Sequence, residues 1–264
     1  MKELINGKVV WITGASSGIG EALAYELARK NCKLILSGRN VEALELVKSK
    51  CATAEVMVLP FDLADFGNAK NNAEKAVTAF GKIDILVNNG GVSQRSLIAE
   101  TDFEVDKKLI EVDYLGTVAI TKALLPHFIK NQSGHFVTIT SLMEKFGSPY
   151  RSGYCGAKHA LHGFFDVLRM EHYKDFLDVT LVCPGFIQTN VAKNALIGNG
   201  SSQNQEDEAT KNGMPVAVFA RKFVKAVESK KFEVYIGGKE IMGVHLKRFF
   251  PKFLHYFVLK SKVK

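Results

Sequence analysis

Short runs of apolar and β-branched residues alternate along the chain with longer segments whose apolar positions recur every three or four residues. The short runs predict seven strands, at residues 8–13, 33–37, 54–60, 83–89, 135–141, 178–184 and 232–237. The longer segments predict helices at 19–30, 41–50 and 67–80, two within 101–131, one that begins near 152, and one at 216–229. Parallel strands need helical crossovers of this kind, so the pattern predicts a doubly wound α/β fold with helices on both faces. No linker or repeat divides the pattern, so residues 1–264 form one predicted domain.

A glycine-rich segment, TGASSGIG at residues 13–20, joins the first strand directly to the first helix. Its glycines, Gly14, Gly18 and Gly20, permit a tight turn and a close backbone approach to a phosphate at the helix N-terminus. The spacing G-x-x-x-G-x-G differs from the G-x-G-x-x-G of other dinucleotide folds. Its position at the first crossover of a parallel sheet predicts a dinucleotide site.

The end of the second strand distinguishes the two nicotinamide dinucleotides. An acidic residue there would hydrogen-bond the adenosine ribose of NAD. The segment LILSGRN has no acid and places Arg39 after the strand. A guanidinium binds a 2′-phosphate through charge-assisted hydrogen bonds, so NADP(H) is the predicted cofactor. The alternative for Arg39 is a solvated charge that follows a strand.

Three polar residues mark the end of the fifth strand and the helix after it. Ser141 ends the strand, and Tyr154 and Lys158 lie about one turn apart in SGYCGAKHAL, residues 152–161. They can converge at the carboxyl edge of the sheet, where ligands bind in open α/β folds. A cation beside a phenol stabilises the phenolate, which makes a tyrosine usable as a general acid or base near neutral pH. Taken alone, the Tyr–Lys pair also fits the polar edge of an ordinary helix.

Along nearly its whole length the sequence resembles the short-chain dehydrogenase/reductase family, which has a Rossmann-type fold. TGASSGIG, NNGG at 88–91 (with Gly in place of the family's Ala), Ser141 with Y-x-x-x-K, and PGFIQT at 184–189 carry the resemblance. It implies that Tyr154 transfers the proton, that Lys158 supports it and binds the nicotinamide ribose, and that Ser141 orients the carbonyl. The residues predicted to bind the cofactor are Gly14, Ser16, Ser17, Gly18, Ile19, Gly20, Ser37, Arg39, Asn40, Asp62, Leu63, Asn88, Gly90, Tyr154, Lys158, Pro184, Gly185, Ile187 and Thr189.

One position departs from the family pattern. The family usually has Asn in the helix before the fifth strand, where its backbone carbonyl holds a water that links the lysine to solvent. The segment EVDYLGT places Asp113 there. Any side chain permits the backbone role, so the proton relay is expected to persist. A carboxylate is also expected to draw Lys158 into an ion pair, which makes Asp113 a fourth candidate catalytic residue.

The expected substrate pocket combines Ser141 with nearby aromatic residues and a long polar insert. Phe146, Tyr150 and Phe186 are the candidate substrate contacts, and each alone fits a core position as well. Residues 188–214 are rich in Gly, Asn and Ser and predict a lid, with a passive insertion as the alternative. The apolar lining predicts a hydrophobic ketone, aldehyde or alcohol rather than a sugar or a small acid.

Charge and cysteine content narrow the remaining classes of function. The formal net charge is +8, but residues 247–264 hold six Lys or Arg and no acid, while the rest is nearly balanced, which argues against nucleic-acid binding. The four cysteines match no zinc pattern, and His159 and His162 have no further ligands nearby in sequence, so no metal site is predicted. The N-terminus reads as a strand rather than a signal peptide, and no apolar run reaches about 18 residues. A cytoplasmic location is therefore expected.

The segment 245–264 mixes its cations with bulky apolar residues: Phe249, Phe250, Phe253, Leu254, Tyr256, Phe257 and Leu259. Pro251 is expected to start or kink a helix there. The pattern favours a helix packed on the core or on a partner subunit. Peripheral contact with a membrane surface is the alternative.

The predicted activity is the NADP(H)-dependent interconversion of a hydrophobic carbonyl compound and its alcohol. The resemblance also implies a homodimer or homotetramer, assembled through the helix that carries Tyr154. A 3-oxoacyl or lipid ketone reductase is an alternative within this class, and the long basic tail counts against the former. A non-catalytic NADP sensor is the alternative outside it, although a sensor has little use for Ser141, Tyr154 and Lys158 together.

Overall fold

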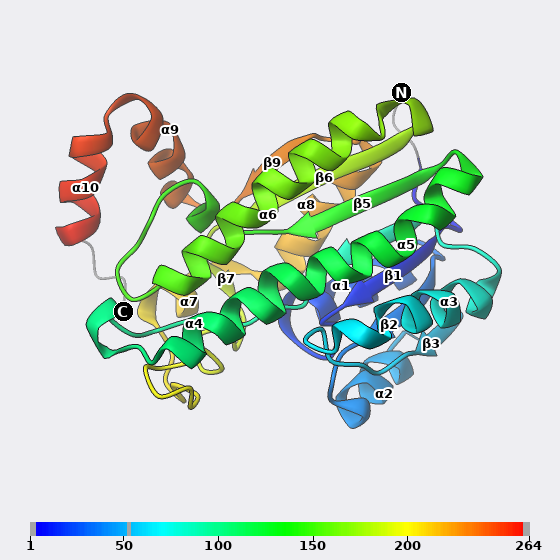
Figure 1. Ribbon diagram of the computed structural model, residues 1–264, viewed down its shortest axis with the longest axis horizontal. Coiled ribbons are helices and arrows are strands. Elements are labelled where there is room, and N and C mark those ends of the chain that lie inside the picture. The colour runs from blue at the N-terminus through cyan, green and yellow to red at the C-terminus, as the bar shows by residue number, and fades with distance from the viewer. Residues whose placement is uncertain (1–3, 52–53, 261–264) are drawn as a thin grey trace.

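The computed structural model describes residues 4–51 and 54–260, and one parallel sheet forms its centre (Figure 1). All seven expected strands are present, in the order β3-β2-β1-β4-β5-β6-β9, and every neighbouring pair is parallel. β1, β4 and β5 are buried at every position, as a sheet covered on both faces requires. The bounds are β1 Val9–Thr13, β2 Lys33–Ser37, β3 Val56–Val58, β4 Ile85–Asn88, β5 Gly134–Ile139, β6 Leu177–Pro184 and β9 Glu233–Ile236.

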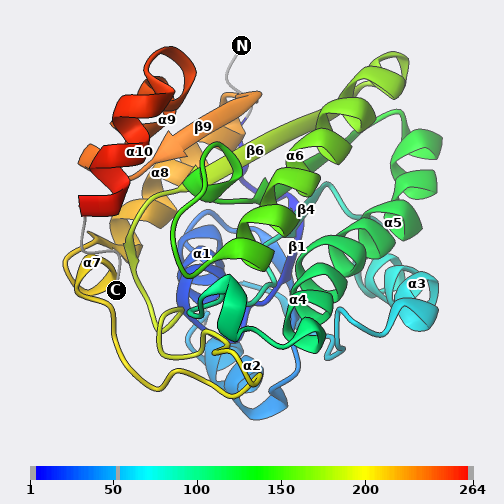
Figure 2. The ribbon, with the colours of Figure 1, turned by 60° about the vertical axis from the view of Figure 1, so that its left-hand side comes forward.

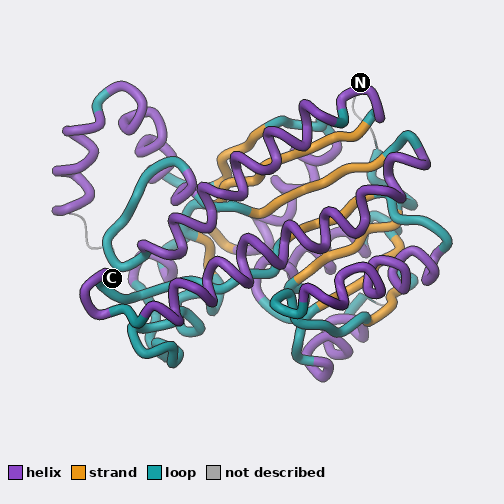
Figure 3. The backbone as a smooth tube through the Cα atoms, viewed as in Figure 1, coloured by secondary structure: helices purple, strands orange, loops and turns teal. Residues whose placement is uncertain are grey.

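Helices cover both faces of the sheet, as the sequence predicts (Figures 1 and 3). On one face, Leu23 and Phe219 belong to one apolar core, and on the other Phe128 and Phe165 belong to a second. The first core is covered by α1 Gly18–Ala28, α2 Val41–Ser49 and α8 Val216–Glu228, and the second by α3 Ala69–Phe80, α5 Thr117–Asn131 and α6 Ser152–Glu171.

The two helices expected within 101–131 form one continuous rod. α4 (Phe103–Leu109) passes into α5 through a π-helical turn at Ile110–Gly116, and the backbone angles stay helical at both junctions. Single π turns occur frequently at functional sites. This one contains Asp113 and ends at Gly116, where an added Cβ would lie 2.8 Å from the Leu63 Cβ. The glycine lets the rod pass close to the loop that follows β3.

The order of the strands creates a crevice at the carboxyl edge of the sheet. The chain moves outward from β1 to β3 and then returns to β4 on the other side of β1. Loops that follow neighbouring strands diverge at such a point, and ligands bind between them. Here the loop after β1 begins at Gly14, and the loop after β4 begins at Asn89.

Residues 188–214, the predicted lid, are seated on the body of the protein. The segment begins at β7 (Ile187–Gln188) and ends at β8 (Met214–Pro215), and these two strands pair in parallel. A short helix, α7 (Glu208–Lys211), lies between them. The Leu196 amide donates to the Ser93 carbonyl, and the Arg95 amide donates to the Leu196 carbonyl, both at 2.8 Å. That the segment opens as a lid stays a prediction.

The C-terminal segment forms two helices beyond the β9 edge of the sheet (Figure 2). They are α9 (Met242–Phe249) and α10 (Pro251–Lys260), so Pro251 starts a helix as expected. Leu254 is buried and packs in one cluster with Phe146, so one face of α10 belongs to the core. Residues 261–264 of the predicted tail lie outside the described residues. Among the described helices, none combines the length and apolar character needed to span a bilayer.

Candidate active site

Ser141, Tyr154 and Lys158 meet at the carboxyl edge of the sheet. Ser141 lies just beyond β5, and α6 begins at Ser152, so its first two turns bring Tyr154 and Lys158 to the same edge. The Lys158 Nζ lies 5.6 Å from the centre of the Tyr154 ring. All three residues line one cavity of about 1150 Å³. The convergence expected from the sequence is therefore present.

Two oxygen atoms hold the Lys158 ammonium at this cavity. Its Nζ donates to the Ile139 carbonyl at 3.4 Å and lies 3.7 Å from the Asp113 Oδ2. Both charged side chains are buried, with 6% and 0% of their surfaces exposed. The Asp113 Oδ1 accepts a 2.7 Å hydrogen bond from the Val92 amide. The expected ion pair between Asp113 and Lys158 is present in this geometry.

Burial is the main influence on the ionisation of Asp113. Removal from water raises the pKa of the carboxyl, and the Lys158 ammonium and the Val92 amide oppose this rise. Within the part of the chain that the structure describes, Oδ2 has no hydrogen-bond partner. Burial of a charged oxygen without a hydrogen-bond partner is unfavourable in free energy, which is why burial raises the pKa of Asp113. When Asp113 is ionised it places a negative charge beside Lys158, and when it is protonated it does not.

The glycine loop after β1 lies directly against the loop after β4. Gly14 has φ +64°, and an added Cβ there would lie 2.6 Å from the Gly90 Cα. The Asn89 side chain donates to the Thr13 and Gly14 carbonyls, each at 3.0 Å, and so ties the two loops together. Asn89 was not among the predicted site residues, although it adjoins Asn88 in the NNGG motif.

The start of α1 meets the requirements of a phosphate site. Ser17 is the N-cap, and its side chain makes no capping hydrogen bond to the helix. The amides of the first turn are therefore not capped by this side chain, and the positive end of the helix dipole lies on the cavity. Gly18 has φ +59°, which glycine adopts without strain. These features fit a dinucleotide pyrophosphate.

The residues predicted to border the adenosine lie at the end of β2 and after β3. The Arg39 Nη1 lies 3.9 Å from the Asp62 Oδ2, and the two side chains are 63% and 44% exposed. The Arg39 guanidinium therefore lies exposed at the cavity wall, beside one carboxylate. Ser37 is buried, and its Oγ accepts a 2.9 Å hydrogen bond from the Trp11 indole.

Most residues predicted to bind the cofactor line this same cavity. They are Gly14, Ser16, Ser17, Gly18, Ile19, Ser37, Arg39, Asp62, Leu63, Gly90, Tyr154, Lys158, Pro184, Gly185, Ile187 and Thr189. Three others lie outside the lining. Gly20 packs beneath the turn against Gly14, and Asn40 caps α2 by accepting from the Ala43 amide. Asn88 is buried and donates to the Thr121 hydroxyl at 3.0 Å.

Of the three predicted substrate contacts, two line the cavity and one does not. Phe146 and Phe186 line the cavity, whereas Tyr150 does not. The Tyr150 backbone has φ +68°, and its carbonyl accepts from the Ser96 amide. Sequence reasoning did not foresee that the C-terminal helices supply a further apolar wall, from Met242, Leu246, Phe253, Leu254, Phe257 and Val258.

Gln94, which sequence reasoning missed, fixes the start of the helix that carries Tyr154. Its side chain is fully buried, and Oε1 accepts from the Gly153 amide at 2.9 Å and from the Tyr154 amide at 3.3 Å. The Nε2 donates to the hydroxyls of Ser96 and Ser152. The carboxamide thus takes the place of an N-cap, because the Arg151 side chain makes no cap bond.

The residue after Gln94 fastens the 188–214 segment. The Arg95 guanidinium lies 2.6 Å from the Asp207 Oδ2, and Arg151 approaches the same oxygen at 3.4 Å. All three side chains are buried, at 4%, 1% and 5% exposure. Burial and the neighbouring Arg95 lower the pKa of Arg151 to about 10, and Asp207 counters them. Asp207 therefore joins the segment to the start of α6.

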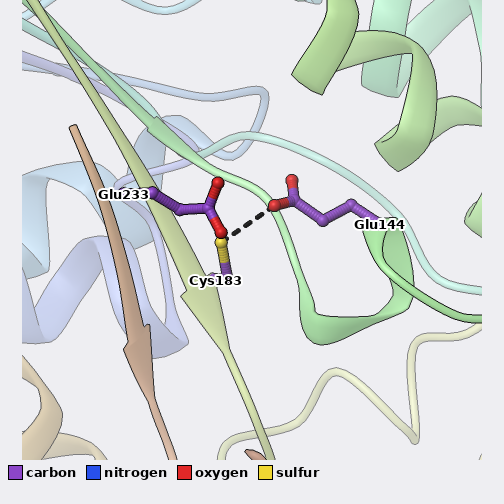
Figure 4. Close-up of side chains that lie close together, drawn as sticks. All are labelled: Glu144, Cys183 and Glu233. Atoms are coloured by element: carbon purple, nitrogen blue, oxygen red, sulfur yellow. Dashed lines mark hydrogen bonds between the residues drawn. The ribbon is translucent and has the colours of Figure 1, made fainter. Parts of the chain in front are cut away.

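Two acidic side chains, Glu144 and Glu233, lie close to the buried thiol of Cys183 (Figure 4). The Cys183 Sγ donates to the Glu144 Oε1 at 2.9 Å, and possible ligand atoms of Glu144, Cys183 and Glu233 lie within 4.8 Å of one another. The Lys145 ammonium lies 2.9 Å from Glu233 and 3.4 Å from Glu144. The His162 ring lies 3.2 Å from Glu144. The Lys145 ammonium therefore lies between the two carboxylates of the cluster.

A family model described as short chain dehydrogenase matches residues 8–199. The chain belongs to the short-chain dehydrogenase/reductase family. A Drosophila melanogaster relative, "Dehydrogenase/reductase SDR family protein 7-like", is 38% identical over 98% of this chain and 81% of its own length. The human "Dehydrogenase/reductase SDR family member 7" is 48% identical over 72% of this chain and 58% of its own length.

Solved structures agree with this assignment of the short-chain dehydrogenase/reductase fold. An alcohol dehydrogenase from Thermococcus sibiricus, complexed with 5-hydroxy-NADP, has a TM-score of 0.74 and 26% identity over 88% of this chain and 97% of its own. A short-chain dehydrogenase/reductase from Burkholderia phymatum, in complex with NAD, has a TM-score of 0.85 and 21% identity over 99% and 98%. The fold thus accommodates both dinucleotides, and the chain is an oxidoreductase of this family.

Asp113→Asn tests the electrostatic effect of the buried carboxylate. The substitution removes a negative charge 3.7 Å from the Lys158 Nζ and so strengthens the positive field at Tyr154. The rate of alcohol oxidation should reach half its maximum about one pH unit lower. The measurement is kcat/KM across the pH range, with Glu111→Gln in the same π turn as control. Overlaid profiles of the Asn variant and wild type would show that Asp113 has no such effect.

Gln94→Met tests the support of α6, since it keeps the side-chain volume and removes the carboxamide. The free energy of unfolding should fall by about 1–2 kcal/mol because two amides lose their acceptor. With Tyr154 less firmly placed, kcat should fall by roughly tenfold while the cofactor Kd stays unchanged. Gln205→Met, at an exposed position, is the matched control. Lower stability with an unchanged kcat would reduce Gln94 to a structural residue.

Proposed function

We propose that the protein interconverts a hydrophobic ketone or aldehyde and its alcohol, with NADP(H) as cofactor. The observation that carries this proposal is the shared cavity. Ser141, Tyr154 and Lys158 line it together with the glycine loop, at the crevice between the carboxyl ends of β1 and β4. A carbonyl group held between the serine and the tyrosine would lie beside the site that the loop offers to a dinucleotide.

The choice of NADP(H) rests on Arg39. The end of β2 offers no carboxylate, and the exposed guanidinium lines the cavity near Asp62. A 2′-phosphate would compete with the Asp62 carboxylate for this guanidinium. The phosphate has the advantage because it carries about two negative charges, whereas the carboxylate carries one. The bound nicotinamide supplies or accepts the hydride in such a reaction. The residues of the chain have to position the substrate and move a proton.

Ser141 is arranged to donate a hydrogen bond to the substrate. Its Oγ accepts from the Met143 amide at 3.1 Å, which occupies one lone pair and leaves the hydroxyl proton for a carbonyl oxygen. Tyr154 donates its proton to that oxygen during reduction and accepts one during oxidation. Lys158 holds positive charge beside the phenol, where it favours the phenolate that remains after proton transfer.

The substrate end of the cavity supports a lipophilic substrate. Phe146, Phe186, Leu246 and Leu254 line it, and the tail places further apolar side chains alongside them. Burial of an alkyl or ring system against these residues contributes about 25 cal/mol for each Å² removed from water. A lipid ketone is therefore the substrate class to test first, together with other hydrophobic ketones and alcohols.

Assembly through α6 is part of the proposal. Val167 and Met170 lie on its outer side and are 46% and 68% exposed, which is a large apolar area for a helix in water. A homodimer or homotetramer that buries this face would leave the catalytic end of the helix in the cavity. Light scattering determines the number of subunits.

Tyr154→Phe separates an enzyme from a non-catalytic sensor. The substitution removes only the hydroxyl, so the turnover of a hydrophobic ketone should fall by roughly 10²- to 10⁴-fold while NADPH binding persists. Turnover is followed by the absorbance of the reduced nicotinamide, and binding by fluorescence titration. Tyr173→Phe, whose side chain is 80% exposed, is the control. Wild type that binds NADPH and reduces no member of a ketone panel would favour the sensor.

Arg39→Asp tests the choice of dinucleotide. The variant carries a carboxylate where a 2′-phosphate would bind, so kcat/KM with NADPH should fall by at least tenfold while that with NADH is retained or rises. Arg29→Asp, at an exposed position after α1, controls for the change of charge. Equal efficiency of the wild type with both cofactors would contradict the assignment of NADP(H).

A further inference from the structure

The two C-terminal helices present an outer face that is unusually apolar for a surface in water. Phe249, Phe250 and Tyr256 are 70%, 64% and 64% exposed, and Leu259 is 60% exposed. Isolated exposed apolar residues are common, but several large exposed side chains on two consecutive helices indicate an interaction site. The helices lie at the side of the molecule, next to β9 (Figure 2), and their inner side packs on Cys183 of β6 and Tyr235 of β9.

The charged side chains of α9 and α10 are all cations. Lys247, Arg248, Lys252 and Lys260 are all exposed. Residues 241–264 contain no Asp or Glu. The formal charge of the chain is therefore concentrated on the helices that also carry the exposed aromatic rings. Basic residues that alternate with Phe, Tyr and Leu suit the boundary between the headgroups and acyl chains of an anionic bilayer.

A second copy of the chain fits this face poorly. An isologous contact would bring the four cations of one protomer against the same four of its partner, and neither α9 nor α10 has an Asp or Glu to offset them. Like charges brought together in an interface are destabilising. An anionic lipid surface satisfies both the charge and the apolar side chains.

The inner face of the same helices forms a wall of the cavity that contains Tyr154. Leu246 and Leu254 line this cavity, and Leu254 is buried. Phe253 lines it as well, yet 60% of its side chain is exposed. Phe253 therefore lies at a rim where the exposed outer face and the interior of the cavity meet.

We propose that the outer face of α9 and α10 docks on the surface of an anionic phospholipid bilayer. The aromatic side chains enter the headgroup region, and the four cations pair with lipid phosphates and carboxylates. The rim of the cavity then faces the bilayer, which gives a lipophilic substrate a direct path from the membrane to Ser141 and Tyr154. This last step rests on the proposed function, and the docking itself does not.

Vesicle flotation of the full chain tests the docking without any turnover. Wild type should float with vesicles of phosphatidylcholine that contain about one third phosphatidylserine, and not with pure phosphatidylcholine. Each cation near an anionic surface contributes roughly a fivefold gain in partitioning, so K247Q/R248Q/K252Q/K260Q should lose at least about 100-fold. F249S/F250S/Y256S should lose binding to a similar degree, because these rings supply the inserted area.

Matched variants on other surfaces control for general loss of charge or of aromatic rings. K70Q/K75Q/R221Q/K222Q removes four exposed cations from α3 and α8, and F103S/Y173S removes two rings that are 78% and 80% exposed. Both should float as wild type does, and circular dichroism should show that every variant is folded.

Failure of wild type to float with anionic vesicles would overturn the proposal, as would tail variants that float like wild type. A drop in oligomer mass in the tail variants, measured by light scattering, would also overturn it and assign the face to a subunit contact. Flotation of a protein that reduces no ketone would support the docking and contradict only the proposed activity.

Discussion

The buried ammonium of Lys158 is the charge around which the site is organised. Its position beside the Tyr154 ring is fixed by the Ile139 carbonyl at the end of β5 and by Asp113 from the π turn. A buried cation is tolerated only where such partners compensate for lost hydration. Two helices and one strand must therefore meet at this edge of the sheet. The glycine loop after β1 lines the same cavity because β1, the neighbour of β4, ends at that edge of the sheet.

The fold could be predicted because its signals are local. Strands buried on both faces read as apolar runs, and helices that cover them show the longer period, so all seven strands and the order of elements follow from the sequence. The rod of α4 and α5 is the exception. A π turn shifts the phase of the apolar pattern much as a short loop does, and periodicity alone cannot tell a break from a continuous helix.

The site was predictable to the extent that its residues lie in short motifs. Residues outside such motifs depend on partners that are distant along the chain: Gln94 meets Gly153 across 59 positions, and Arg95 meets Asp207 across 112. A buried glutamine and arginine read in sequence as ordinary loop residues. Asn88 and Tyr150 are the converse case: they lie in a matching motif or segment but do not line the cavity, so their roles at the site stay predictions. Sequence adjacency fixes which loop a residue joins, and packing decides which way its side chain points.

The C-terminal helices contact the loop that follows Ser141 through one aromatic ring, Phe146. Phe146 lies five residues beyond Ser141 and packs with Leu254 of α10, while an added Cβ at Gly243 of α9 would lie 2.9 Å from its ring. The other side of the same loop is held by Glu144 and Lys145 against β6, β9 and α6. Ionic and hydrogen-bond contacts of Glu144 and Lys145 hold one side of the loop, and the packing of Phe146 on α9 and α10 holds the other. A shift of the loop would therefore displace α9 and α10. The shape of the substrate wall beside Ser141 is therefore coupled to the position of α9 and α10, which pack on Phe146.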